Sequence, residues 1–350
     1  MARVWDVPVH DPTRVRDARV AAEAASALAG LGERRTAAAA LVASELATNL
    51  LKHAGGGQLL VDVVAPPLPR SPRPGAGVVQ IAAIDRGPGL DDVPGALSDG
   101  FSTAASLGAG LGTCRRAADT FDLHGAPGRG TVAVARIGDL AGPGTPAGAS
   151  ARAGGITVPF AGADCSGDAW TWARSHTRLS LVLADGLGRG PEAAAASGVA
   201  VQAVHRSAHL APAELLRQAE DALRGTRGAA MAVAQLDTGT GVLSFAGVGN
   251  VGARLRHRGT WRPLLSRPGA VGVHRPARLH QQQVPWAPDG LLILHSDGLP
   301  SRWTPPPDAF PRTADPAVAA AVTVRDASSF ARPVRDDLTV AVLSPAADVS

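Results

Sequence analysis

Aspartates in the second half of the chain lie at the ends of short apolar runs, where they could act together. They occur in the segments GADCSGDAWTW, LSLVLADGLGRG, LLILHSDGL and VRDDLTVAVL. Carboxylates at the ends of different strands can meet at one edge of a sheet, and an all-oxygen cluster suits Mg²⁺ or Mn²⁺ better than Zn²⁺. Two such ions activate water for attack on a phosphate ester, so the pattern predicts metal-dependent hydrolysis of phosphomonoesters. Cysteine-based phosphatase chemistry is not expected, because the chain has no Cys-x5-Arg loop.

The first half carries a different set of polar residues and glycines. Glu45 and Asn49, in the segment SELATNLLKHA, are four residues apart, so a helix places both on one face. Asp85 follows an apolar run in the segment IDRGPGL, and Gly87 and Gly89 come directly after it. These pieces are separated in sequence, and they form a site only if the fold brings them together.

Three alternate glycines, Gly108, Gly110 and Gly112, precede a predicted helix near residues 113–119. Free N–H groups and the dipole at a helix start favour a phosphate group there. A Walker loop is excluded because its lysine follows a glycine, and the sole lysine of the chain, Lys52, follows a leucine. A dinucleotide fingerprint is excluded because its glycines follow directly on a strand, whereas these follow the polar run SDGFSTAAS.

In order along the chain, SELATNLLKHAGGG, DRGPGL, ALSDGFSTAASLGAGLG and GRGTVAVAR resemble the consecutive signatures of the GHKL ATPase fold. That fold is shared by histidine kinases, gyrase and the anti-sigma serine kinases. The resemblance covers nearly all of residues 10–137 and is closest to the RsbT-type switch kinases of bacterial partner-switching pathways.

This resemblance implies a site for ATP and Mg²⁺. Asn49 would hold the Mg²⁺ ion that bridges the phosphates, and Glu45 would orient or deprotonate the attacking serine hydroxyl. Asp85 would accept a hydrogen bond from the adenine amino group. The other implied positions are Gly87 and Gly89 against the base, Thr131 at the adenine end, and Gly108, Gly110 and Gly112 in a lid over the phosphates.

Residues 154–345 resemble the SpoIIE/RsbX branch of the metal-dependent type 2C protein phosphatases. The segments SGDAW, ADGLGRG, GVGNVG, HSDGL and RDDLTVAV follow the motifs of that family in order. The resemblance implies two Mn²⁺ or Mg²⁺ ions and places Asp185 and Asp297 at the centre of catalysis. The implied metal ligands are Asp168, Asp185, the carbonyl of Gly186, Asp297 and Asp336.

Several positions of this second site remain open in the sequence. Asp337 is the alternative to Asp336, and Asn250 is expected near the site without an assigned role. The first motif has one glycine before Asp168 and no acid soon after it, which resembles the RsbX variant and leaves a third metal ion open. Asp164 is a further alternative ligand.

Two separate scaffolds must position these two sets of residues. Residues 138–153 are dominated by Gly, Ala and Pro, which is the composition of an exposed linker. We therefore expect a GHKL ATP-binding domain at 1–137 and a phosphatase domain at 154–350. The resemblances imply an α+β chain of two domains, an α/β sandwich of the Bergerat type followed by an α-β-β-α sandwich.

Apolar periodicity predicts the elements of both halves. In the first half we expect helices at 11–31, 33–54 and near 113–119, and strands at 58–64, 78–85 and 130–137, with a hairpin loop at 65–77. In the second half we expect strands at 178–185, 231–237, 241–249, 252–259, 290–297 and 338–344, and helices near 191–209 and 212–224.

Composition excludes some other classes of protein. The chain has 350 residues and a formal net charge of +4, and its arginines are dispersed without interleaved aromatic residues, so nucleic-acid binding is not expected. It has no apolar run of about 20 residues and no apolar leader at its start, so we expect no membrane span. The two cysteines form no disulfide or zinc pattern, which is typical of a reducing, cytoplasmic location.

The two resemblances lead to one main hypothesis and two alternatives. The main hypothesis is a bifunctional regulator whose kinase-like and phosphatase domains act on a STAS-type antagonist and its phosphorylated form, with an anti-sigma factor or stressosome-like complex as a further partner. In the first alternative the ATP-binding domain transfers no phosphate and only gates the phosphatase. In the second, the basic residues bind nucleic acid, which predicts strongly salt-dependent association.

Overall fold

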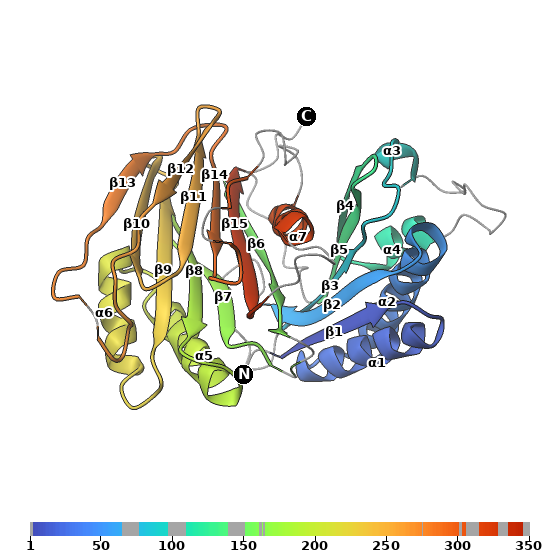
Figure 1. Ribbon diagram of the computed structural model, residues 1–350, viewed down its shortest axis with the longest axis horizontal. Helices are drawn as coiled ribbons and strands as arrows, with labels where there is room; N and C mark the ends of the chain where they lie inside the picture. Colours follow the sequence, from blue (N-terminus) through green and yellow to red (C-terminus); the bar gives the residue numbers. More distant parts are fainter. Residues whose placement is uncertain are drawn as a thin grey trace. The chain divides into compact units, whose positions relative to one another are not determined.

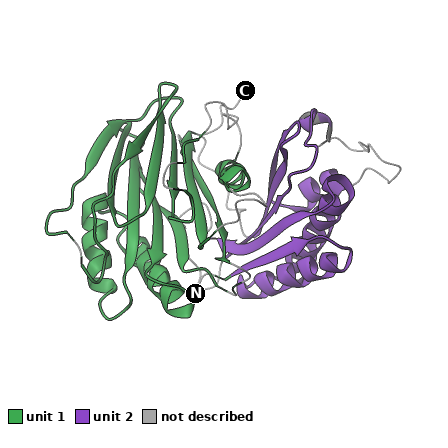
Figure 2. Ribbon diagram, viewed as in Figure 1, with its two compact units in different colours: residues 1–3, 67–69, 146–350 green, residues 4–66, 70–145 purple. Residues whose placement is uncertain are grey.

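The computed structural model describes residues 3–64, 77–96, 110–138, 151–160, 163, 165–274, 276–300, 303–305, 315–327 and 335–345. These residues divide into two compact units (Figure 2), which we call the N-terminal unit, residues 4–138, and the C-terminal unit, residues 151–345. The predicted linker at 138–153 lies mostly outside the described residues, and its end overlaps strand β6, Ala151–Val158.

The N-terminal unit is built on a five-stranded sheet (Figure 1). Its order is β1-β2-β3-β5-β4, and each neighbouring pair is antiparallel. The strands in this order are Val4–Val9, Gly57–Val64, Val78–Ile84, Gly130–Gly138 and Thr120–Ala126. The antiparallel pairing of β2 with β3 agrees with the predicted hairpin, whereas β1 and β4 were not predicted.

Helices α1, Thr13–Leu28, and α2, Glu33–Ala54, cover one face of this sheet (Figure 1). Their contact is built from small side chains at helical spacing, which let the two helices approach closely. Fully buried alanines of this contact and of the core beneath it are Ala18, Ala22, Ala25, Ala39, Ala43 and Ala47. Gly55 caps the C-terminus of α2, and its φ of 68° is the left-handed conformation that glycine adopts without strain.

Two shorter helices complete the described part of this unit, α3 at Val93–Ala96 and α4 at Gly110–Ala117. Helix α4 corrects the prediction near 113–119, because it begins at Gly110 and therefore contains Gly110 and Gly112. Its packing against α2 explains this start: a Cβ atom at Gly110 would lie 3.2 Å from Asn49 Oδ1, so close approach outweighs the low helix propensity of glycine.

The C-terminal unit contains two five-stranded antiparallel sheets. We call β13-β10-β9-β8-β7 the first sheet and β12-β11-β14-β15-β6 the second sheet. The strands of the first sheet, in that order, are Gln282–Pro285, Val242–Val248, Ala229–Asp237, Arg178–Gly186 and Asp168–Ser175. Those of the second sheet are Thr260–Leu264, Gly252–His257, Leu291–His295, Leu338–Pro345 and Ala151–Val158.

The two sheets of the C-terminal unit enclose one core and carry helices on their outer faces (Figure 1). Alternate residues such as Leu181 and Leu183 of the first sheet face Leu292 and Leu294 of the second. Helices α5, Pro191–Arg206, and α6, Pro212–Ala222, pack on the first sheet, and α7, Pro316–Ala327, packs on β6 and β15. The predicted α-β-β-α sandwich is thus confirmed, with β6, β7, β12, β13 and α7 as elements that were not predicted.

Among the helices in the described part of the chain, none has both the length and the apolar character that crossing a bilayer requires.

Candidate functional sites

The fold brings the predicted phosphate end of the first site together from two helices. Glu45 and Asn49 lie on α2, both half-buried, and Gly110 begins α4 beside them. A Cβ atom at Gly110 would lie 3.2 Å from Asn49 Oδ1 and 3.3 Å from Glu45 Oε2. The Nδ2 atom of Asn49 is buried and has no hydrogen-bond partner among the described residues, so it is available to a ligand.

Asp85 is held at the other end of this site by backbone groups. It follows β3 directly, and its Oδ1 atom accepts hydrogen bonds from the N–H groups of Gly87, at 2.8 Å, and Thr131, at 3.0 Å. The Asp85 N–H in turn donates to the carbonyl of Thr131 at 2.9 Å. These bonds fix the direction of the carboxylate through one of its two oxygens, which is what recognition of a single amino group requires.

Gly87 and Gly89 are glycines because neighbouring backbone comes too close for a side chain. A Cβ atom at Gly87 would lie 2.8 Å from the Cα atom of Ala54 at the end of α2. Gly89 has a φ of +81°, and a Cβ atom there would lie 2.1 Å from the carbonyl oxygen of Ala126. The DRGPGL turn is therefore packed against α2 on one side and β4 on the other.

The predicted glycine lid is only partly described. Gly108 lies outside the described residues, while Gly110 and Gly112 belong to the first turn of α4 rather than to a loop before it. Gly112 is buried, and Gly110 contacts Asn49 and Glu45. The start of α4, with its free N–H groups, thus lies beside the two predicted phosphate-side residues.

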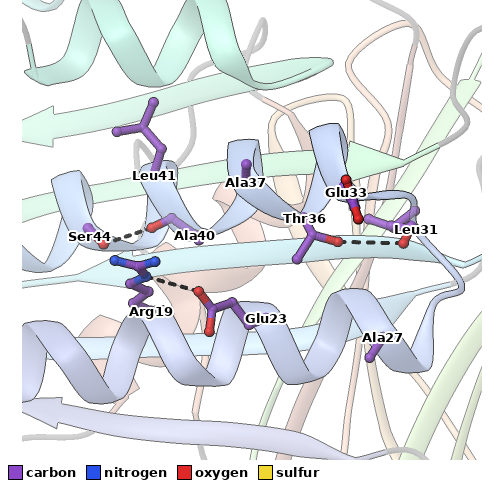
Figure 3. A pocket seen from close by; sticks show the side chains of 10 residues that line it. All are labelled: Arg19, Glu23, Ala27, Leu31, Glu33, Thr36, Ala37, Ala40, Leu41 and Ser44. Atoms are coloured by element: carbon purple, nitrogen blue, oxygen red, sulfur yellow. Dashed lines mark hydrogen bonds and ion pairs between the residues drawn. The ribbon is translucent and has the colours of Figure 1, made fainter.

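A groove between α1 and α2, with a volume of about 590 Å³, lies apart from these residues (Figure 3). Its lining includes the apolar residues Ala27, Ala37, Ala40 and Leu41. It also includes Arg19 and Glu23, which form an ion pair with 2.9 Å between Nε and Oε1. None of the predicted site residues lines it. This groove is therefore not the predicted nucleotide site.

The second site is centred on a pair of aspartates that face each other across two strands. Asp168 begins β7 and pairs in register with Asp185, the residue before the last in β8. Burial and then the charge of Asp185 raise the pKa of Asp168 well above its usual range, and its Oδ2 atom is buried without a hydrogen-bond partner. A buried carboxylate paired with a half-buried one is stabilised by protonation or by a nearby positive charge.

The second sheet contributes carboxylates to the same place. Asp297 follows the end of β14, and Asp336 precedes the start of β15. Because these two strands are antiparallel neighbours, both residues lie at the same end of the strands. The pKa of Asp185 is raised to about 7, first by burial and then by the negative charges of Asp297, Asp336 and Asp337. The amide of Asn250 donates to Asp297 Oδ2, so the residue expected near the site contacts one of its carboxylates.

Asp336 and Asp337 have different partners, although they are consecutive. Both oxygens of Asp337 accept backbone N–H groups, Oδ1 from Phe160 at 2.7 Å and Oδ2 from Gly167 at 2.6 Å, and the residue is buried. Asp336 instead accepts from Arg189, whose Nε atom lies 3.0 Å from Oδ1 and whose Nη2 atom lies 2.9 Å from Oδ2. The geometry therefore favours Asp336 over Asp337 as the candidate ligand.

Gly186 completes the predicted ligand set as the last residue of β8. A Cβ atom there would lie 2.1 Å from the carbonyl oxygen of Ala193, so α5 approaches the strand end too closely for any other residue. Asp164, the further alternative ligand, lies outside the described residues.

In this structure the carboxylates do not form a complete metal-binding site. Among the described residues, no three His, Cys, Asp or Glu side chains are grouped closely enough to hold an ion. The donor set nevertheless fits a hard divalent cation: its oxygens converge from both sheets, Asp168 Oδ2 is orphaned, and burial raises the pKa of Asp297 as well. Sequence reasoning did not single out Arg189, which donates hydrogen bonds to Asp336. In the sequence, its position four residues after Asp185 was the signal that it could lie near the site.

Comparison with known proteins finds a family match in each unit. Residues 9–136 match the family described as histidine kinase-like ATPase domain, and residues 175–345 match the family described as stage II sporulation protein E, SpoIIE. The chain thus matches a histidine kinase-like ATPase domain followed by a SpoIIE domain, in the order that the motifs predicted. These domain types imply ATP and metal ions, in general terms, as their ligands.

Three known proteins are each similar to part of the chain. The serine/threonine-protein kinase RsbT of Bacillus subtilis (strain 168) is 41% identical over 88 residues, which is 25% of this chain and 61% of RsbT, less than two thirds of its length. A solved structure described as the bacterial stressosome, a modular system adapted to control secondary messenger signalling, is 27% identical, with a TM-score of 0.50 over 55% of this chain and 98% of that chain. RsbX, solved in complex with magnesium, is 20% identical, with a TM-score of 0.48 over 57% of this chain and 96% of that chain.

Proposed function

We propose that this chain, which joins a histidine kinase-like ATPase domain to a SpoIIE domain, is a bifunctional regulator of a bacterial partner-switching pathway. Its C-terminal unit would remove phosphate from phosphoserine or phosphothreonine of a STAS-type antagonist, and its N-terminal unit would bind ATP and phosphorylate the same class of protein. The observation that carries the proposal is that Asp168 and Asp185 pair in register in the first sheet, and that the charges of Asp297 and Asp336, from the second sheet, act on Asp185.

The phosphatase half of the proposal assigns a task to each carboxylate. Asp185 and the Gly186 carbonyl end one strand beside Asp168, and Asp297 with Asp336 face them from the second sheet, so these groups would together hold two Mn²⁺ or Mg²⁺ ions. Such ions supply an activated water molecule and neutralise charge on the phosphate group. Asn250, which donates to Asp297, would keep that carboxylate in its orientation.

The kinase half of the proposal rests on the contacts around α2. Asn49, with its unpartnered amide, would help hold Mg²⁺ and the phosphates, and Glu45 on the same face would orient or deprotonate the incoming serine hydroxyl. Asp85, held by the N–H groups of Gly87 and Thr131, would accept from the adenine amino group. Gly89 would keep the backbone close to the base, and Gly110 and Gly112, in the first turn of α4, would lie on the phosphate side of the site.

A second candidate function is a phosphatase that is gated by an ATP-binding but non-transferring N-terminal unit. Binding of ATP needs Asn49 and Asp85 but no base. Glu45, however, lies with Asn49 against the start of α4, as Gly110 shows by its approach to both side chains. A candidate base placed beside the candidate phosphate-side residue favours phosphate transfer over sensing alone.

One experiment separates these functions. The full chain is incubated with γ-labelled ATP, Mg²⁺ and a candidate STAS-domain protein, and in parallel with Mn²⁺ and the phosphorylated form of the same protein. The bifunctional proposal expects label on the STAS protein in the first reaction and its loss in the second. Bound ATP without transfer supports the gated phosphatase, and an unchanged phosphoprotein in the second reaction contradicts the phosphatase itself.

A further inference from the structure

The core between the two sheets of the C-terminal unit ends in polar side chains beside the candidate metal site. On β7, Asp168 lies on the same face as Trp172, and on β15, Thr339 lies on the same face as Ala341 and Leu343. Trp172, Ala341 and Leu343 pack in the core that the two sheets share. Asp168 and Thr339 therefore point between the sheets, where they are only 2% and 0% exposed.

Hydroxyl groups in and beside the second sheet form a hydrogen-bonded chain at this end of the core. The Oγ1 atoms of Thr157 and Thr339, which are register partners in β6 and β15, lie 3.0 Å apart. The Thr339 N–H donates to Ser296 Oγ at 2.9 Å, and the Ser296 N–H donates to the Thr339 carbonyl at 3.0 Å. All three residues are buried, and a buried hydroxyl group destabilises the fold unless it is hydrogen-bonded.

This chain of hydroxyl groups reaches the carboxyl group of Asp168. Burial raises the pKa of Asp168 most, the charge of Asp185 raises it further, and side-chain hydrogen bonds from Ser296 and Thr339 lower it. The Ser296 hydroxyl also lies 3.4 Å from the carbonyl oxygen of Asp337, which is long for a hydrogen bond. The two hydroxyl groups therefore connect Asp168, on the first sheet, to residues of the second.

The proposed function makes Asp168 a metal ligand and gives these hydroxyl groups no task. A carboxylate that binds a cation needs a fixed direction, which hydrogen bonds from the residues behind it provide. Resting on the proposed phosphatase function, we propose that Ser296 and Thr339 are positioning residues: their hydroxyl groups hold the Asp168 carboxylate from the second sheet, and its Oδ2 atom, which has no hydrogen-bond partner among the described residues, binds the cation. Their effect should therefore appear in the affinity for metal rather than in the affinity for substrate.

Thr339→Val removes one of these hydroxyl groups and keeps the branched shape of the side chain. In the full chain, the affinity for Mn²⁺, measured by calorimetry without substrate, should fall about tenfold. The KM for a phosphoserine peptide at saturating Mn²⁺ should stay within about twofold, because no substrate contact is lost. Thr339→Ser keeps the hydroxyl group and should bind Mn²⁺ within about threefold of the unaltered chain. Ser296→Ala should weaken Mn²⁺ binding as Thr339→Val does, and it replaces that variant if the valine protein does not fold.

Thr157→Val provides a matched control, because it removes the other hydroxyl group of the same buried pair. A hydroxyl group has one hydrogen, so Thr157 donates to Thr339 when Thr339 donates to Asp168. Thr157→Val therefore keeps both hydroxyl groups that reach Asp168, and the Mn²⁺ affinity should change by less than about twofold. Urea unfolding of both valine variants, followed by tryptophan fluorescence, verifies that each is folded.

Three results would overturn the positioning role: a folded Thr339→Val protein with unchanged Mn²⁺ affinity, a Thr157→Val protein that loses as much affinity, or a Thr339→Ser protein that does not regain it. If the unaltered chain hydrolyses the peptide and any of these is found, the positioning role alone is wrong. It is also wrong if Asp168→Asn binds Mn²⁺ as the unaltered chain does, because Asp168 is then not a ligand. If the unaltered chain neither binds Mn²⁺ nor hydrolyses the peptide, the proposed phosphatase function fails, and the positioning role fails with it.

Discussion

Asp168 and Asp185 stand opposite each other in the register of β7 and β8, and the surroundings raise the pKa of both carboxyl groups. A fold that needed only stability would not bury two acids side by side, because each disfavours the charge of the other. A bound cation, as proposed for this site, would offset that repulsion.

The first prediction concerns pH. The pKa of Asp185 is about 7 in the folded chain, against about 3.9 in an unfolded chain, so folding favours the protonated form. This contribution to stability is fully present below about pH 4 and is lost as the pH rises towards 7, at up to about 1.4 kcal/mol per unit. Urea unfolding of the metal-free chain, followed by tryptophan fluorescence, should show that loss, and Asp185→Asn should lessen it. Parallel pH profiles for the two proteins would contradict the assignment.

The second prediction is a double dissociation between the two units. Asp297→Asn should reduce Mn²⁺-dependent cleavage of a phosphoserine peptide by at least about a hundredfold and leave ATP affinity unchanged. Asn49→Ala should abolish ATP binding and leave peptide cleavage unchanged. Peptide hydrolysis and calorimetric ATP titration measure the two activities on the same preparations. Loss of both activities in either folded variant would mean that the sites are not independent.

Glu45 separates transfer of phosphate from binding of ATP. Because its side chain lies beside Gly110 and Asn49 but would act on the incoming hydroxyl, Glu45→Gln should keep ATP affinity within about threefold and lower the rate of transfer to a STAS protein by about 10²–10⁴. The measurement is single-turnover labelling at saturating ATP. A transfer rate equal to that of the unaltered chain would remove Glu45 from the role of base.

Replacement by alanine should cost much more stability at Asp337 than at Asp336. Asp337→Ala removes the acceptor of two backbone N–H groups, one buried and one part-buried, and should lower the free energy of unfolding by about 3 kcal/mol. Asp336→Ala removes a half-exposed ion pair and should cost under about 1 kcal/mol, while it weakens Mn²⁺ binding. Urea unfolding and calorimetry compare the two; equal losses of stability would show that the roles of the neighbours are not distinct.

Gly89 and Gly128 form a matched pair in the N-terminal unit. Both have φ near +70° to +80°, but a Cβ atom at Gly89 would lie 2.1 Å from the carbonyl oxygen of Ala126, whereas at Gly128 it would meet nothing within 4 Å. Gly128→Ala should therefore cost only the backbone strain, about 1–2 kcal/mol. Gly89→Ala should cost more and also weaken ATP binding, because the turn beside Asp85 must move. Similar unfolding midpoints for the two variants would show that the turn has room to adjust.

Sequence periodicity predicted the buried, regularly patterned elements well and the edges poorly. The apolar runs of β8, β9, β14 and β15 are continuous, and their positions agree with the expected strands. Strand β1 was missed because Asp6 and Pro8 interrupt its pattern. It is an edge strand that pairs only with β2, and an edge strand tolerates a proline. The start of α4 was missed because glycine is a poor helix former and only the contact of Gly110 with α2 explains it.

In the candidate sites, too, some residues could be selected from the sequence and others could not. Motifs were enough to select Asp85, Asp185 and Asp297, because each comes directly after or near the end of a recognisable strand. They could not distinguish Asp336 from Asp337, since the distinction depends on Arg189 and Phe160, which are distant in sequence and carry no periodic pattern. The orientation of a side chain at a strand end is a tertiary property, and local sequence does not determine it.

Strand β15 pairs along its whole length with β6, from Leu338↔Val158 to Pro345↔Ala151, although the two are separated by nearly the entire C-terminal unit. During synthesis on a ribosome, β6 therefore emerges long before its neighbour exists, and the second sheet stays incomplete until the last strand follows. Asp336 leads directly into that strand, so the carboxylate cluster is the last part of the unit to assemble. A nascent chain would therefore complete the sheet of the N-terminal unit well before the carboxylate cluster of the C-terminal unit can form.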